Sequence, residues 1–258
     1  MSSAHLVPPF AVPTHAGAGA PAAAAGTELV RIKVWDLVVR ITHWTIVVAI
    51  ALLAVTGIYI GHPFLLAPGA AGTHFVMGTM KAVHSYSAIA FTLAVLARIA
   101  WAFVGSRHAR WWNFVPVHRD RQRGVIGTLK FYLFLRLAPP PFAGHNPVAG
   151  LTYLAVFGLY LVMILSGLGL YAMSANVASP MHWFRPLLAL FWGAQNARWI
   201  HHVVMWMLIG FTVHHVYSAL LVANVEKNGT LDSIFSGYKW MRRDEIAQEP
   251  LADAKKTR

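Results

Sequence analysis

Four long apolar segments recur along the chain, separated by shorter polar stretches. They predict membrane-spanning helices at about 37–60, 83–104, 147–173 and 199–223, because a helix needs about 20 mostly apolar residues to cross the hydrocarbon core of a bilayer. Asn146 before Pro147 predicts the start of the third span, since Asn is a favoured N-cap and Pro a favoured first helical residue. The pattern therefore predicts an all-α membrane protein, a four-helix bundle.

Three segments outside the spans can be interpreted from their composition. Residues 1–27 are rich in Ala, Pro and Gly and lack a basic stretch followed by an apolar core, which predicts a disordered tail rather than a signal peptide. Residues 127–138 are too few to cross a bilayer, and their aromatic and cationic side chains predict a segment at the membrane interface. We therefore expect one transmembrane domain at 28–225 and a soluble C-terminal tail at 226–258.

The basic residues are distributed unevenly between the two sides of the predicted bundle. The formal net charge is +12, and nearly every Lys and Arg lies in the two tails or in the segment 105–145. The two remaining loops contribute only Lys81, Arg185 and Arg198. By the positive-inside rule, both termini and the middle loop are predicted to be cytoplasmic. The positive charge thus indicates a membrane surface, and no nucleic-acid partner is expected.

The chain contains no cysteine. This excludes disulfides, an iron–sulfur cluster ligated by cysteines of this chain, and covalently attached c-type haem, which requires a C-x-x-C-H motif. Any haem in this protein would therefore be held without a covalent bond.

Histidines inside the predicted spans are the strongest candidates for chemistry. His201 and His215 are fourteen residues apart, which places them within about 40° of one helix face and roughly 21 Å apart along the axis. By depth, His201 matches His84 (the far-side pair) and His215 matches His43 (the tail-side pair). Two imidazoles from facing helices can fill both axial positions of a haem iron. A single such histidine is more often a packing or helix-end residue, but ionisable groups inside spans are usually functional.

Other residues fall at the same two depths. Gly57 lies fourteen residues after His43, where the missing side chain would let a porphyrin approach; ordinary close helix packing is the alternative. Arg98 lies fourteen residues after His84 and is a candidate partner of a haem propionate; the alternative is that it reaches out to the interface. The weaker candidates for propionate binding are Arg40, Lys81 and Arg198.

Several motifs resemble those of a known family. The segments 40–44 (Arg-Ile-Thr-His-Trp) and 53–57 (Leu-Ala-Val-Thr-Gly) resemble the first signature of the b-type cytochrome subunit of membrane-bound NiFe-hydrogenases. The run from Arg198 through His201 and Trp206 to His215 resembles the second signature, and 144–147 and 236–238 also look like that family. The resemblance covers roughly residues 30–242. One departure is that Ile200 precedes His201, with Trp199 displaced by one place.

The resemblance implies a cofactor, partners and a location. Members of that family anchor the small and large hydrogenase subunits on the periplasmic side of the bacterial inner membrane. They take electrons from an iron–sulfur cluster of the small subunit and pass them through haem b to membrane quinone. Carried over to this chain, His84 and His201 would ligate the iron of the proximal haem, and His43 and His215 that of the distal haem. Two haems are expected, with no hydrogen chemistry in this chain.

Other functions fit parts of the pattern. A stand-alone dihaem cytochrome b561 would oxidise a small reductant such as superoxide and would need no protein partner. The cytochrome b subunit of a formate dehydrogenase-type complex shares the four-helix plan with paired histidines. A transporter using the histidines and Arg98 as a proton or metal path would show no haem absorbance. The quinone site is left open among Trp44, His214, Tyr217 and Asn224, and no role is assigned to His202 and His214.

Overall fold

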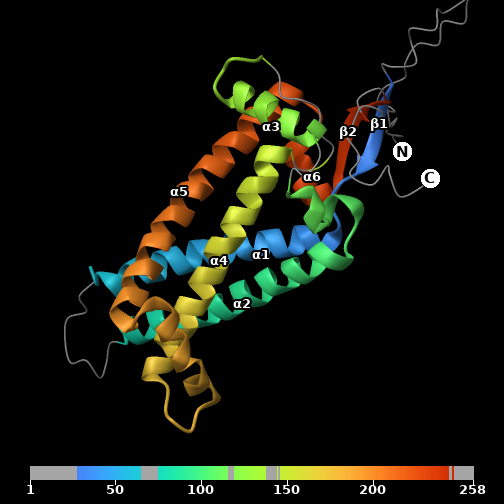
Figure 1. Cartoon of the computed structure of the whole chain (residues 1–258). Coiled ribbons are helices and arrows are strands. Elements are labelled where there is room, and N and C mark those ends of the chain that lie inside the picture. Colours follow the sequence, from blue (N-terminus) through green and yellow to red (C-terminus); the bar gives the residue numbers. More distant parts are fainter. Residues whose placement is uncertain are drawn as a thin grey trace, which may run out of the picture.

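The computed structural model describes residues 28–64, 75–115, 119–137, 144, 146–243 and 246. Long helices dominate this part of the chain, joined by loops and 3-10 segments and accompanied by one pair of strands (Figure 1). The predicted tail at 1–27 and the end of the C-terminal tail lie outside the described residues. In chain order the elements are β1 (Leu29–Lys33), α1 (Leu37–Gly61), α2 (Val76–Val104), η2 (Arg107–Ala109), η3 (Trp111–Asn113), α3 (Arg119–Tyr132), α4 (Pro147–Ser174), η4 (Pro180–Phe191), α5 (Ala194–Glu226), α6 (Thr230–Ser236) and β2 (Tyr238–Arg242).

The four predicted spans are confirmed as the helices α1, α2, α4 and α5, each long and apolar enough to cross a membrane. Two of them begin earlier than the apolar pattern suggested, α2 at Val76 and α5 at Ala194. Their first two turns carry exposed polar residues such as Lys81 and Asn196. The early starts have a simple reason, since a helix can continue past the hydrocarbon core into the polar headgroup region.

The spans form two antiparallel pairs, α1 with α2 and α4 with α5, and the two pairs cross in the view of Figure 1. Where they meet, apolar side chains from all four helices form the core, among them Ile46, Val95, Tyr160 and Leu208. Even so, only 17% to 33% of the most apolar stretch of each span is buried within the chain. Large exposed apolar surfaces of this kind are typical of contact with a membrane.

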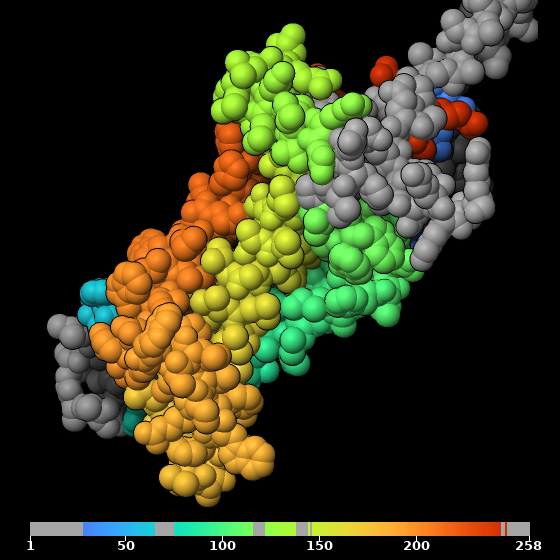
Figure 2. All heavy atoms as spheres, in the orientation of Figure 1, coloured from blue at the N-terminus to red at the C-terminus, as the bar shows by residue number. Residues whose placement is uncertain are grey.

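Short helical segments cover the two ends of the bundle, with α3 projecting at one end and η4 at the other (Figure 2). The interfacial segment predicted at 127–138 is helical only as far as Tyr132. Phe134 then adopts a left-handed backbone with a φ of 58°, and Leu135 N–H donates to the Lys130 carbonyl at 2.8 Å. A left-handed residue with such a bond ends a helix, so the aromatic run continues as a turn.

The two ends of the described chain meet in an antiparallel ribbon, which the sequence analysis did not predict. Strand β1 pairs with β2 in a register from Leu29 opposite Arg242 to Lys33 opposite Tyr238. Gly237 precedes β2 with a φ of 88°, and its carbonyl accepts from the N–H groups of Val34 and Trp35. A Cβ on Gly237 would lie 2.8 Å from the Trp35 carbonyl oxygen, so both the backbone and the space require glycine here.

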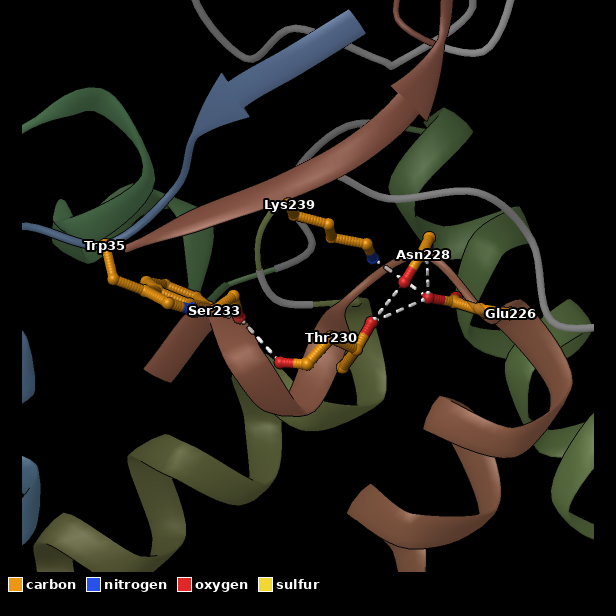
Figure 3. Close-up of polar contacts among 6 residues, drawn as sticks. All are labelled: Trp35, Glu226, Asn228, Thr230, Ser233 and Lys239. Carbon is orange, nitrogen blue, oxygen red and sulfur yellow. Dashed lines mark hydrogen bonds and ion pairs between the residues drawn. The ribbon is translucent and has the colours of Figure 1, made fainter. Parts of the chain in front are cut away.

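A buried ion pair fixes this ribbon to the end of α5 (Figure 3). Lys239 Nζ lies 2.9 Å from Glu226 Oε2, and the two side chains are 8% and 16% exposed. Asn228 Nδ2 and Thr230 Oγ1 donate to the same oxygen at 2.8 and 3.0 Å. Beside them, Trp35 Nε1 donates to Ser233 Oγ at 3.0 Å. We call β1, α6, β2 and these contacts the terminal clasp.

Replacing Lys239 with methionine is expected to destabilise the terminal clasp by about 3 kcal/mol, since it leaves a buried carboxylate without its cation. Hydrogen exchange of the backbone amides in 226–243 measures the effect, and they should exchange faster. Arg243→Met is the matched control, because the Arg243–Glu28 pair is 65% and 62% exposed and an exposed pair contributes about 0–1 kcal/mol. Equal exchange in the two variants would contradict the prediction.

Candidate functional site

The spans bring the tail-side histidines together. His43 on α1 and His215 on α5 have ring centroids 6.4 Å apart with an interplanar angle of 56°. Two imidazoles that bind one metal ion from opposite sides, through bonds of about 2 Å, have ring centres about 6 Å apart. The ring of Phe211 stacks on His215 at 5.5 Å. Distance alone does not identify a ligand pair, because His62 and His202 at the far end are also 6.3 Å apart.

The far-side histidines are held by hydroxyl groups from neighbouring helices. Thr56 Oγ1 on α1 lies 2.9 Å from His84 Nδ1 on α2. Ser166 Oγ on α4 lies 2.8 Å from His201 Nδ1 on α5. The two histidine side chains are close enough to interact electrostatically. In both rings the Nδ1 atom is engaged, which leaves Nε2 as the atom that can bind a metal.

A glycine keeps space beside each of these rings. A Cβ on Gly57 would lie 3.4 Å from His84 Cε1 and 3.6 Å from the sulfur of Met205. On the other side, a Cβ on Gly167 would lie 3.3 Å from His201 Cε1. Gly57 thus lies next to His84 of the far-side pair. Gly167 was missed by the sequence analysis, although Ser166-Gly167 repeats the hydroxyl–glycine order of Thr56-Gly57.

Arg98 lies inside the protein and does not reach the interface. It is 3% exposed, and its Nη1 lies 3.5 Å from the Ala109 carbonyl. The guanidinium carbon is 5.1 Å from the Tyr153 ring centre and 5.7 Å from that of Phe114, within the range of cation–π attraction. Among the described residues, Nη2 of Arg98 is buried with no hydrogen-bond partner. A second acceptor, such as a carboxylate, fits this atom.

Asp36 supplies a fixed negative charge at the same end of the bundle. Its Oδ2 accepts from Trp101 Nε1 at 2.9 Å and from Ser106 N–H at 3.0 Å. Burial opposes ionisation of Asp36, but the hydrogen bonds from Ser106 and Trp101 and the charge of Lys33 outweigh it and lower its pKa below the ordinary value. Asp36 also interacts electrostatically with Arg98. The charge of Arg98 is therefore partly balanced by the chain itself.

The other candidate cations lie elsewhere. Arg40 donates from Nη1 to the Phe235 carbonyl in α6, and Trp44 stacks on the Phe235 ring at 4.7 Å. These contacts join α1 to the terminal clasp, although Arg40 Nε is buried without a partner among the described residues. Lys81 and Arg198 are exposed, the latter 3.4 Å from Gln195. Neither makes a described contact with a histidine of the two pairs.

Four membrane-length helices with histidines paired between them fit one class of protein, the membrane-bound b-type cytochromes, with these imidazoles as candidate haem ligands. The chain belongs to the prokaryotic cytochrome b561 family, whose model matches residues 34–237. Together with the four apolar helices, this membership identifies an integral membrane protein. The motif resemblance noted in the sequence is confirmed.

Curated relatives match most of the chain. A protein of Cupriavidus necator named probable Ni/Fe-hydrogenase B-type cytochrome subunit is 35% identical over 224 residues, covering 84% of this chain and 91% of its own. A protein of the same name from Bradyrhizobium diazoefficiens is 32% identical over 241 residues, covering 86% and 98%. The probable Ni/Fe-hydrogenase 1 B-type cytochrome subunit of Escherichia coli K12 is 35% identical, covering 84% and 94%.

Proposed function

We propose that this chain is the haem b membrane anchor of a NiFe-hydrogenase, accepting electrons from the iron–sulfur small subunit and delivering them to membrane quinone. The observation that carries the proposal is the placement of two histidine pairs within the spans. One helix, α5, contributes His201 to one pair and His215 to the other. The ring centre of His43 on α1 lies 6.4 Å from that of His215, and His84 on α2 is close enough to His201 to interact with it electrostatically. The names of the relatives support the hydrogenase as the electron donor.

The residues present fit haem b. His84 and His201 have Nδ1 engaged and Nε2 available, and His43 Nδ1 is buried without a partner among the described residues. Gly57 and Gly167 leave space against the two far-side imidazoles. Haem b supplies an iron that gains and loses one electron reversibly. Two imidazoles per iron would leave no position open for oxygen, so these side chains would favour electron transfer over oxygen binding.

The chain's own residues then have three roles. His84 and His201 would hold the proximal haem, and His43 and His215 the distal one. Arg98, whose Nη2 has no hydrogen-bond partner in the described part of the chain, is the candidate for a propionate. The apolar spans keep water from the haems, and burial of this kind is one determinant of haem potential. The excess of Lys and Arg in the tails and in 105–145 supports cytoplasmic termini in the bacterial inner membrane, with the far-side pair towards a periplasmic hydrogenase.

Co-purification and reduction by hydrogen test this proposal. The full chain is isolated from its native membrane through a C-terminal affinity tag, under mild detergent. The hydrogenase small and large subunits should co-purify, and hydrogen should produce the reduced b-type α-band and then reduce added quinone. The chain expressed without the hydrogenase is the control, and it should hold haem but respond only to a chemical reductant.

The alternative functions give different results in the same experiment. A haem-loaded chain that purifies alone and is reduced by superoxide would indicate a stand-alone dihaem cytochrome b561. Co-purification with formate dehydrogenase subunits would replace the hydrogenase with another electron donor. A pure chain with no b-type absorbance would overturn the haem assignment and favour transport.

A further inference from the structure

Two dipeptides of the same kind flank the far-side histidines from opposite helices. Thr56-Gly57 lies on α1 next to His84, and Ser166-Gly167 lies on α4 next to His201. In each case the hydroxyl contacts Nδ1, while a Cβ on the glycine would contact Cε1 of the same ring. A hydroxyl residue and the glycine that follows it therefore lie against the Nδ1–Cε1 edge of each imidazole.

The direction of these hydrogen bonds follows from the one proton that a hydroxyl carries. Thr56 Oγ1 lies 2.6 Å from the Leu52 carbonyl in its own helix. Ser166 Oγ lies 2.6 Å from the Val162 carbonyl. Each hydroxyl proton is thus donated to a carbonyl, and the oxygen accepts from the imidazole. The proton of each neutral ring then resides on Nδ1, and the lone pair on Nε2.

The surroundings strengthen this arrangement. Thr56 is 4% exposed and Ser166 is 0% exposed, so water does not compete for the Nδ1–H group. The Leu53 backbone is a second hydrogen-bonding partner of His84, whereas Ser166 is the hydroxyl that engages His201. Replacement of Ser166 should therefore have the larger effect of the two.

The tail-side pair is built differently. His43 Nδ1 is buried and has no hydrogen-bond partner among the described residues, and no hydroxyl contact is described for it. A hydrogen bond from Nδ1–H raises the basicity of the ligating nitrogen and fixes the ring orientation. The two pairs therefore differ in the outer contacts that influence haem potential.

We propose that Thr56 and Ser166 are positioning residues for the proximal haem. They fix the Nδ1–H form of His84 and His201, which makes Nε2 of each ring a more basic, stronger ligand to the iron. The inference rests on the proposed haem-binding function. A more basic imidazole stabilises the oxidised iron, so the two hydroxyls lower the reduction potential of the proximal haem. Loss of either hydroxyl should raise that potential and leave the distal one unchanged.

The test is a spectroelectrochemical titration of the purified full chain, with electron paramagnetic resonance of the oxidised protein as a second readout. Ser166→Ala and Thr56→Val should each raise one of two reduction potentials and shift the g-values of one haem. Haem affinity at that site should fall by about tenfold. Ser166→Thr and Thr56→Ser keep a hydroxyl group and should therefore retain the native reduction potentials and g-values. Thr92→Val is the matched control, because Thr92 donates to the Ala88 carbonyl of its own helix.

The outcomes separate this inference from the proposed function. If the native protein holds two haems and Ser166→Ala changes neither reduction potential, the inference alone is overturned. It is also overturned if Ser166→Thr does not retain the native potentials. Native protein without haem would overturn the inference together with the proposed function. If Ser166→Ala does not fold, Ser166→Cys retains the volume with a much weaker acceptor and should raise the same potential. An unchanged potential in that variant would also reject the inference.

Discussion

Replacing His201 with alanine is expected to remove the proximal haem and to stop hydrogen-dependent quinone reduction. Under the proposed function His201 would be one of the two residues that hold the proximal haem, and its Nδ1 lies 2.8 Å from Ser166 Oγ. Loss of an outer-shell partner costs roughly 10- to 100-fold in metal affinity, so loss of the ligand itself should cost more. Haem per chain should fall from two to one, measured by pyridine haemochrome absorbance against protein mass.

The adjacent histidine provides the matched control. His202 is on the same helix but lies next to His62, with ring centroids 6.3 Å apart, and next to Gly61 rather than Gly167. His202→Ala should therefore retain both haems and reduce quinone at a rate near the native one. If His202→Ala lost a haem and His201→Ala retained both, the assignment of ligands on α5 would be wrong.

Replacing Gly167 with leucine is expected to abolish the proximal haem while leaving the four-helix fold intact. A Cβ at this position would already lie 3.3 Å from His201 Cε1, so a branched side chain must displace the imidazole. A displaced imidazole would no longer hold the haem through Nε2, and the expected result is one haem per chain.

Gly158 on the same helix is the control for that substitution. A Cβ there would have nothing within 4 Å, so Gly158→Leu should retain both haems. The circular dichroism of both variants should match that of the native protein, which would show that the helices persist. Normal haem content in Gly167→Leu would mean that the space beside His201 has no part in haem binding.

The four spans could be predicted from the sequence, because apolar length and helical spacing are local patterns. Apolar length identifies a membrane helix, and fourteen residues between His201 and His215 keep them near one face. The terminal clasp could not be predicted in this way. Its strands have only five residues each, and contacts such as Trp35 to Ser233 join positions 198 apart.

The contacts that Thr56, Ser166 and Arg98 make with other parts of the chain could not be predicted from the sequence pattern either. Ser and Thr inside a helix commonly bond a carbonyl of the preceding turn, and both Thr56 and Ser166 do so. Their second contact, with a histidine on another helix, depends on how that helix is rotated. Arg98 is a similar case, because the segment containing Ala109 and Phe114 covers it and keeps it from the interface.

The number of b-type haems per chain, in the native protein and in His43→Ala and His84→Ala, tests the central claim most directly. The two-level arrangement predicts two low-spin haems in the native protein and one in each variant. The spectrum and potential of the surviving haem should differ between the two variants, since each substitution removes a different haem. Identical surviving haems, or two haems retained in both variants, would contradict the pairing of these histidines.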